Sequence, residues 1–149
     1  MKQPDAFDNP NWLFEVKYDG FRSLAFIGEG TCQLISRKGH KYDRFKSLAR
    51  SLSQLPHQTV LDDEIACVDE NGLPQFDDLY FANRPALFFA FDILALDGND
   101  VRESQCMDRK GALRGLTDEG VPRLHYVDYV DHVEETGVRL YEMICKPDM

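Results

Sequence analysis

The stretch from Ala86 to Leu96 is the most apolar part of the chain, and it limits the folds that the sequence can adopt. It is too short to cross a membrane as a helix, which takes about 20 apolar residues. It is rich in phenylalanine, which favours extended backbone, and it stops at the turn sequence Asp97-Gly98-Asn99. The pattern predicts a buried strand, so the rest of the chain must supply its neighbours.

Other strand signals lie on both sides of this run. The segments Arg22–Ile27 and Cys32–Arg37 flank Gly28-Glu29-Gly30-Thr31, which is typical of a β-hairpin with glycine in a left-handed conformation. A further strand is predicted at Thr59–Val68, and the Asn-Gly pair that follows it indicates a turn. Shorter strands are predicted at Trp12–Lys17 and Arg123–Val130.

Helical spacing of apolar residues appears in four places. After Asp43, a predicted helix cap, the apolar positions are spaced as on one helix face until Pro56. The other predicted helices are Phe76–Phe81, Gln105–Leu116 and Glu134–Lys146. Because helices and strands do not alternate strictly, the sequence predicts an α+β fold of antiparallel β-sheets flanked by helices. The length of 149 residues fits one domain.

The charge of the chain is acidic overall but uneven. The net charge of −9 argues against a free-standing nucleic-acid binder, because phosphate contacts need a positive surface. From Glu15 to Arg50, however, there are 8 basic and 4 acidic residues. Two interpretations stay open: a solvated basic loop and helix, or a positive surface that meets phosphates.

Cysteine usage and the start of the chain favour a cytoplasmic protein. No C-x-x-C pair occurs, which argues against a zinc ribbon, and four free thiols suit a reducing compartment. The first residues lack the apolar segment of a secretory signal, and no apolar run is long enough to span a membrane.

One segment carries candidate chemistry: Glu15-Val16-Lys17-Tyr18-Asp19-Gly20-Phe21-Arg22, with the pattern Lys-x-Asp-Gly-x-Arg. A lysine at a strand end beside Asp-Gly can be held facing a pocket. An amine is nucleophilic only when unprotonated, which burial, neighbouring cations or a bound metal can promote. The alternative is a surface lysine paired with a neighbouring carboxylate, with the glycine serving a turn.

This pattern resembles the first motif of covalent nucleotidyltransferases, which include ATP-dependent DNA ligases, RNA ligases and mRNA-capping guanylyltransferases. Three later stretches follow in the order and spacing of the adenylation domain of short bacterial ATP-dependent DNA ligases. They are Leu34-Ile35-Ser36-Arg37-Lys38-Gly39-His40, Val60-Leu61-Asp62-Asp63-Glu64-Ile65 and Phe89-Ala90-Phe91-Asp92-Ile93-Leu94. The resemblance covers nearly everything from Asp8 onward, and it implies a ligase nucleotidyltransferase fold of the ATP-grasp-like kind.

The resemblance also implies a three-step reaction with ATP and Mg²⁺ as cofactors and nicked duplex DNA as the partner. A lysine forms a lysyl-AMP phosphoramidate, AMP moves to the 5′-phosphate at the nick, and the 3′-hydroxyl then displaces AMP. By this resemblance Lys17 is the nucleophile, Glu15 binds the adenine amino group and Phe91 stacks on adenine. Arg22 contacts the sugar or the nick phosphate, and Glu64 binds the ribose or a metal. Arg37 contacts nucleotide or DNA phosphate, and Asp19 also lies near DNA or phosphate.

Each carried-over role has a simpler alternative. Phe91 lies in an apolar run and suits the core, Glu64 suits a solvated strand end, and Arg37 suits a solvated loop. The family usually has Asp-Gly-Glu where this chain has Asp62-Asp63-Glu64. We therefore expect an additional side chain and charge beside the proposed pocket.

The 149 residues stop where the resemblance leads into the fourth motif, Glu-Gly-x-Val-x-Lys. We therefore expect residues 1–149 to form a partial adenylation domain without the OB-fold domain, to adenylate weakly or not at all, and to seal no nicks unaided. An unpaired sheet edge would suit a second chain that completes the site. Two other hypotheses stay open: a related RNA ligase or capping enzyme, and a non-catalytic remnant that binds a nucleotide or a protein.

Overall fold

The computed structural model describes residues 14–15, 17–127 and 129–130, which fall into two compact units. The first unit combines residues 1–17 and 127–149, and its described strands are β1 (Phe14–Glu15) and β8 (Tyr129–Val130), paired antiparallel. The second unit is Tyr18–Tyr126. The predicted Glu134–Lys146 helix and most of the predicted Trp12–Lys17 strand lie outside the described residues.

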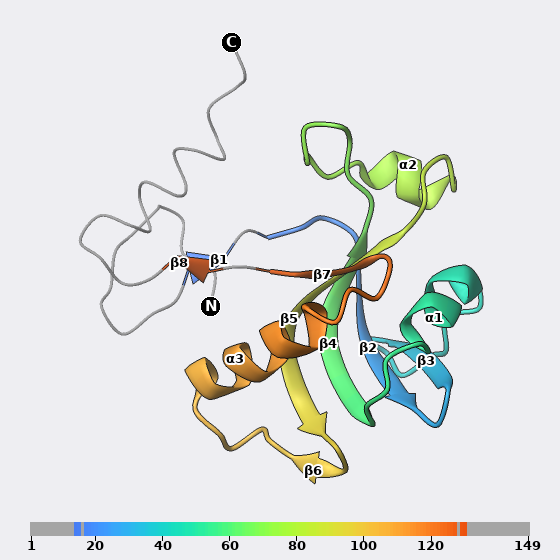
Figure 1. The fold of residues 1–149 in the computed structure, drawn as a ribbon. Helices are drawn as coiled ribbons and strands as arrows, with labels where there is room; N and C mark the ends of the chain where they lie inside the picture. Colours follow the sequence, from blue (N-terminus) through green and yellow to red (C-terminus); the bar gives the residue numbers. More distant parts are fainter. Residues whose placement is uncertain (1–13, 16, 128, 131–149) are drawn as a thin grey trace. The chain divides into compact units, whose positions relative to one another are not determined.

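The second unit is built on one mixed sheet, shown as a ribbon in Figure 1. Its strands follow the order β3-β2-β4-β5-β6, and β7 pairs with β5. All pairs are antiparallel except β5 with β7. Their bounds are β2 (Phe21–Gly28), β3 (Thr31–Ser36), β4 (Thr59–Ala66), β5 (Leu87–Leu96), β6 (Asn99–Asp100) and β7 (Leu124–Tyr126). The predicted α+β class with antiparallel strands is confirmed.

The hairpin between β2 and β3 turns where the sequence predicts it. Gly28 pairs with Thr31, so Glu29 and Gly30 form the two-residue turn. Both have positive φ, at 51° and 74°. This geometry matches the right-handed twist of the two strands. Glycine accepts it freely, whereas Glu29 adopts it at some cost.

Three helices accompany the sheet: α1 (Lys46–Leu52), α2 (Phe76–Tyr80) and α3 (Cys106–Thr117). The predicted cap at Asp43 is wrong, because the residue before α1 is Phe45 and no side chain caps the helix. Phe45 is buried in the core. Burial of its ring, rather than a capping hydrogen bond, sets where α1 begins.

One face of the sheet forms the core of this unit. Alternate residues of a strand point to opposite faces, and the odd-numbered residues of β2 and β4 are buried, apart from the partly buried Phe21. They pack with Leu48 and Leu52 of α1 and with Leu113 and Leu116 of α3. The even-numbered residues lie on the other side, here called the open face: Arg22, Leu24 and Phe26 of β2, and Val60, Asp62 and Glu64 of β4.

Strand β5 is irregular where it pairs with β4. Asp62 lies opposite Asp92 and Asp63 lies opposite Ala90, so Phe91 is an extra residue in β5. Such a β-bulge re-aims the side chain of the extra residue. The sequence predicts the strand, but its apolar residues form a continuous run that does not indicate a bulge.

Asp63 is a carboxylic acid in the core. It is 0% exposed, its Oδ1 accepts a hydrogen bond from Ser23 Oγ at 2.8 Å, and its Oδ2 has no hydrogen-bond partner among the described residues. Burial raises the pKa of Asp63 well above its ordinary value, and the hydrogen bond from Ser23 opposes this only in part. The expected additional charge beside the pocket is therefore wrong, because the side chain points to the opposite face from Glu64.

Replacing Asp63 with asparagine should make the free energy of unfolding fall less as the pH rises. The raised pKa means that the folded state keeps a proton that the unfolded chain, with a pKa of about 3.9, has lost. Wild-type stability therefore falls as pH rises above about 4, by at most about 1.4 kcal/mol per pH unit. Urea unfolding from pH 5 to 8 should show the Asp63→Asn variant gaining on the wild type as pH rises. His57, whose pKa Glu119 raises, affects both proteins alike.

The exposed Asp77→Asn variant is the matched control and should track the wild type. A constant stability difference between the Asp63→Asn protein and the wild type across this pH range would contradict a proton held on the buried carboxyl.

Gly20 meets the backbone of β4. A Cβ atom at this position would lie 2.0 Å from the carbonyl oxygen of Ile65. Its φ is not in the left-handed region, so the lack of a side chain, rather than a special turn, explains the glycine. The segment before β2 can lie against β4 only with glycine here.

Substituting Gly20 with alanine should destabilise the second unit by about 1–3 kcal/mol or more, as overpacking against backbone does. The matched control is Gly111→Ala in α3, where a Cβ meets nothing within 4 Å. That change should stabilise the protein by about 0.5–1 kcal/mol. Denaturant midpoints of both variants measure this contrast, and equal midpoints would show that Ile65 does not exclude a side chain.

Candidate active site

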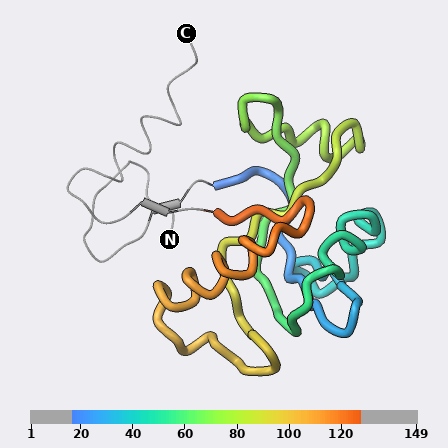
Figure 2. Tube along the Cα trace, viewed as in Figure 1, coloured from blue at the N-terminus to red at the C-terminus, as the bar shows by residue number. Residues whose placement is uncertain are grey.

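The segment that follows Lys17 is anchored by stacked rings. The Tyr18 ring lies on Phe89 of β5, with centroids 3.9 Å apart and planes at 13°, and His125 of β7 stacks on Phe89 at 5.4 Å. Burial raises the pKa of Tyr18 and lowers the pKa of His125. Figure 2 shows that the start of the second unit (blue) and its end (orange-red) lie on the same side of that unit. The sequence does not predict this role of Tyr18, because the motif leaves its position unspecified.

Arg22 is held over the open face by a carboxylate. Its Nε donates to Asp62 Oδ1 at 3.1 Å and its Nη2 to Asp62 Oδ2 at 2.8 Å, a two-pronged grip that fixes the guanidinium plane. The hydrogen bonds that Arg22 donates to Asp62 raise the pKa of Arg22. The guanidinium carbon lies 5.2 Å from the centroid of the Phe91 ring. Asp62, to which the sequence analysis gave no role, therefore orients Arg22.

Glu64 lies beside this pair. It is directly opposite Arg22 across β2 and β4, and opposite Phe89 across β4 and β5. Its side chain is half-buried on the open face. Strand register therefore brings Arg22, Glu64 and Phe91, three of the predicted site residues, to one place on the sheet.

Two basic residues of α3 fix the bulge that carries Phe91. Lys110, only 5% exposed, donates from Nζ to the carbonyl oxygen of Phe91. Arg109 Nε donates to Asp92 Oδ1 at 2.9 Å, which also accepts from the backbone N–H of Ile93. A bulge leaves backbone groups without their usual strand partners, and Lys110 supplies one for the carbonyl. The Phe91 ring is half-buried and is therefore not a core residue.

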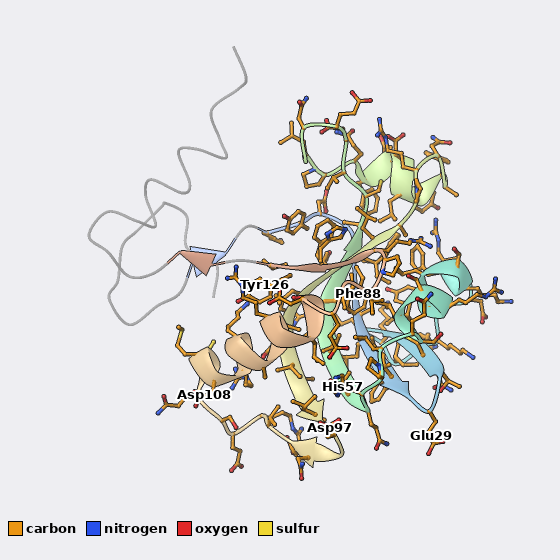
Figure 3. The ribbon with its side chains drawn as sticks, in the orientation of Figure 1. Glu29, His57, Phe88, Asp97, Asp108 and Tyr126 are labelled. Atoms are coloured by element: carbon orange, nitrogen blue, oxygen red, sulfur yellow. The ribbon has the colours of Figure 1, made fainter. Side chains whose placement is uncertain are left out.

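Lys110 also lies over the Tyr126 ring at 5.6 Å, as does Arg114 at 5.5 Å. Figure 3 shows Tyr126 next to α3. Nothing in the sequence indicates these roles, because a lysine in an amphipathic helix is usually solvated.

The remaining predicted residues lie in exposed segments. Arg37 follows the end of β3 in a tight loop, in which Ser36 N–H donates to His40 O at 2.7 Å. Because Ser36 pairs with Ser23, Arg37 lies at the same end of the sheet as Arg22. Asp19 is exposed. Glu15, in β1, and the exposed Lys17 belong to the first unit and are described only within it.

Metal binding has limited support from side chains alone. Within the described ranges, no three His, Cys, Asp or Glu side chains lie close enough together to hold an ion. Asp62 is bound by Arg22, and Glu64 lies on the same open face, directly opposite Arg22. None of the helices in the described part of the chain is long and apolar enough to cross a membrane.

Comparison with known proteins gives consistent matches. Residues 2–146 match the model of the ATP dependent DNA ligase domain. The multifunctional non-homologous end joining protein LigD of Mycolicibacterium smegmatis is 38% identical over 115 residues, covering 73% of this chain and 15% of LigD. DNA ligase C2 of the same organism is 33% identical over 131 residues, covering 78% of this chain and 37% of the relative. The chain thus spans well under half of these relatives.

Solved structures agree with the sequence matches. The ligase domain of M. tuberculosis LigD has a TM-score of 0.75 at 27% identity, covering 89% of this chain and 43% of the other. A mycobacterial DNA ligase D complexed with ATP and MES has a TM-score of 0.73 at 28% identity, covering 89% and 44%. The match over residues 2–146, together with the arrangement of Arg22, Glu64 and Phe91, leads to one assignment. This chain belongs to the ATP-dependent DNA ligase domain family.

Proposed function

We propose that this chain is the nucleotide-binding part of a ligase adenylation domain and that Lys17 is its nucleophile. The Lys17 amine attacks the α-phosphorus of ATP, a P–N bond forms, and pyrophosphate leaves as the P–O bond breaks. AMP then passes to the 5′-phosphate of nicked DNA, and the 3′-hydroxyl displaces AMP to seal the strand. The observation that supports this most is the placement of Arg22, Glu64 and Phe91 on one sheet face.

The roles proposed for these side chains follow from their chemistry. The half-buried face of Phe91 suits stacking on adenine, and the Glu15 carboxylate suits an amino group. Asp62 leaves part of the Arg22 guanidinium free to donate to the sugar or to phosphate. Asp19 and Arg37, both exposed, are assigned to contacts with DNA or phosphate.

Mg²⁺ is the proposed metal, with Glu64 as its protein ligand. Magnesium is commonly bound by one or two carboxylates together with substrate phosphates, so the half-buried Glu64 carboxylate on the open face suits this role. When bound, the ion neutralises charge that develops on the phosphates. Glu64 otherwise accepts a hydrogen bond from a ribose hydroxyl.

The biological setting is proposed from the relatives. Relatives named for non-homologous end joining support a role in DNA repair and recombination. The proposed location is the cytoplasm, which suits free cysteines. Guanylyl transfer and RNA ligation are the competing activities for the same lysine chemistry. A non-catalytic role is the other alternative, with a second chain pairing at the β3 edge of the sheet.

Incubation with α-labelled ATP and magnesium, followed by denaturing electrophoresis, tests the nucleophile. Label should stay on the wild type and be lost in Lys17→Ala and Lys17→Arg, because guanidinium keeps the charge but is not nucleophilic. These 149 residues should label weakly and gain from an added chain carrying Glu-Gly-x-Val-x-Lys. Equal labelling of Lys17→Ala would disprove the assignment, and labelling by GTP instead would favour capping chemistry.

Lys110 should affect ATP binding through Phe91. Phe91→Leu should weaken equilibrium ATP binding about 5- to 150-fold, the range for losing one base–aromatic stack. Lys110→Met should weaken binding severalfold by releasing the bulge, yet add little in the Phe91→Leu background. Arg114→Met, which also removes a cation from the Tyr126 ring, is the control and should bind ATP normally. Additive losses in the double variant would show that Lys110 acts independently of Phe91.

A further inference from the structure

Exposed apolar side chains are concentrated in one short stretch of the second unit. Of the six large hydrophobic side chains that are exposed among the described residues, four lie in this stretch: Leu73, Phe76, Tyr80 and Phe81. Tyr80 is 54% exposed and Phe81 is 67% exposed. Single exposed apolar residues are common, but a group of neighbouring aromatic rings indicates a surface that another molecule covers.

Three of these rings are in contact and form one surface, here called the α2 aromatic surface (Phe76, Tyr80 and Phe81). The ring centroids of Phe76 and Tyr80, one helical turn apart on α2, are separated by 6.3 Å, and Phe81 meets Tyr80 edge-on at 5.1 Å. Because α2 lies in the connection between β4 and β5, it is at the other end of β5 from β6, as Figure 1 shows. Phe76 packs on Phe21, which points to the core side of the sheet, whereas Arg22 points to the open face. The surface is therefore separate from the candidate active site.

Arg44 holds the α2 aromatic surface in place. Its Nη2 donates to the carbonyl oxygens of Leu79 and Tyr80, at 3.1 and 2.6 Å, where the end of α2 leaves carbonyls without helical partners. Its guanidinium carbon also lies 5.5 Å from the centroid of the Tyr80 ring. A ring that is already fixed in the free protein loses little conformational freedom when a partner binds, and this favours binding.

The chain around these rings is acidic. From Asp69 to Arg84 there are four acidic residues and one basic residue, and that arginine is paired with Asp78. Asp77 is exposed, and no basic side chain in the described part of the chain forms an ion pair with it. A negative surface repels phosphates, which argues against DNA as the molecule that covers the rings. It attracts a cationic partner instead.

Aromatic rings beside a carboxylate are well suited to bind arginine. A guanidinium group stacks on an aromatic face and donates hydrogen bonds to a carboxylate, whereas the ammonium of lysine is a compact, strongly hydrated charge. The rings are exposed rather than enclosed, which suits an extended segment better than a small molecule. We propose that the α2 aromatic surface docks an arginine-containing, partly apolar segment of a partner protein. This docking is independent of the adenylation chemistry of the proposed function.

Fluorescence anisotropy with a short labelled peptide in which arginine and leucine alternate tests the surface. Phe81→Ser should weaken binding of this peptide about 2- to 30-fold, the range for losing one cation–π contact. The matched control is Phe26→Ser, which removes an exposed ring from the open face and should bind the peptide as the wild type does. Asp77→Asn should weaken binding by up to about fivefold, as expected for an exposed ion pair. Asp108→Asn, in the first turn of α3 (Figure 3), is its control and should have no effect.

The chemistry of the peptide gives a second comparison. Lysine in place of arginine should weaken binding to the wild type and reduce the effect of Phe81→Ser, because an ammonium does not stack as a planar guanidinium does. Glutamate in place of arginine should abolish binding. Equal affinities of the wild type and Phe81→Ser for the arginine peptide, or no binding by the wild type, would overturn the proposal. Equal losses in Phe81→Ser and Phe26→Ser would show unspecific apolar adhesion and would overturn it as well.

Two other occupants of the surface would give different results. Binding of labelled oligo-dT that is lost in Phe81→Ser would show that the rings stack on bases, and the proposal would be wrong. Self-association that is lost in Phe81→Ser, measured by sedimentation without peptide, would show that a second copy of the chain covers the rings, and would contradict the proposal equally.

Lysyl-adenylate formation separates the docking surface from the proposed function. The Phe81→Ser variant should form the adduct as the wild type does. A wild-type chain that binds the peptide without any adenylation refutes the nucleophile alone, and one that adenylates without binding the peptide refutes the docking surface alone. Unfolding midpoints of the variants check that folded proteins are compared.

Discussion

The antiparallel pairing of β2 with β4 is the constraint on which the candidate site depends. It places Arg22 opposite Glu64 and leaves Asp62 one step along the same face, where it grips the arginine. The side chains between them point the other way and build the core. A slip of one residue would exchange the two faces, moving Arg22 into the core and Ser23 to the open face. Core packing therefore protects the arrangement of the site.

Phe91 shows how the same sheet departs from regularity for a purpose. A regular strand would alternate faces without interruption, but the bulge inserts Phe91 between residues that pair with Asp62 and Asp63. The bulge exposes a carbonyl that Lys110 satisfies from α3 and places the ring under Arg22. Burying a lysine is costly, and this hydrogen bond and the Tyr126 ring offset part of the cost. Lys110 therefore couples the position of α3 to the orientation of the Phe91 ring.

Local features of the sequence predicted much of the fold. The β2–β3 turn and the strand Leu87–Leu96 depend on residues adjacent in the chain, so they could be predicted. The predicted cap of α1 at Asp43 was wrong, because the start of this helix depends on the burial of Phe45 against distant residues. Alternation along β4 places the side chains of Asp63 and Glu64 on opposite faces of the sheet, although we expected the Asp63 side chain beside the pocket. The roles of Asp62, Tyr18 and Lys110 depend on register and helix packing, which one sequence does not contain.

The acidic net charge and the basic segment 37–50 are compatible once the ion pairs of the described residues are taken into account. Most arginines elsewhere in the described part of the chain are already paired or bonded to carbonyls, so they contribute little free positive charge. Arg37, Lys38, Lys41, Lys46 and Arg50 pair with no carboxylate of the described residues and lie after β3 or in α1, while acidic residues outnumber basic ones from residue 51 onward. Such a contrast orients a ligand more strongly than a uniform positive charge of the same size.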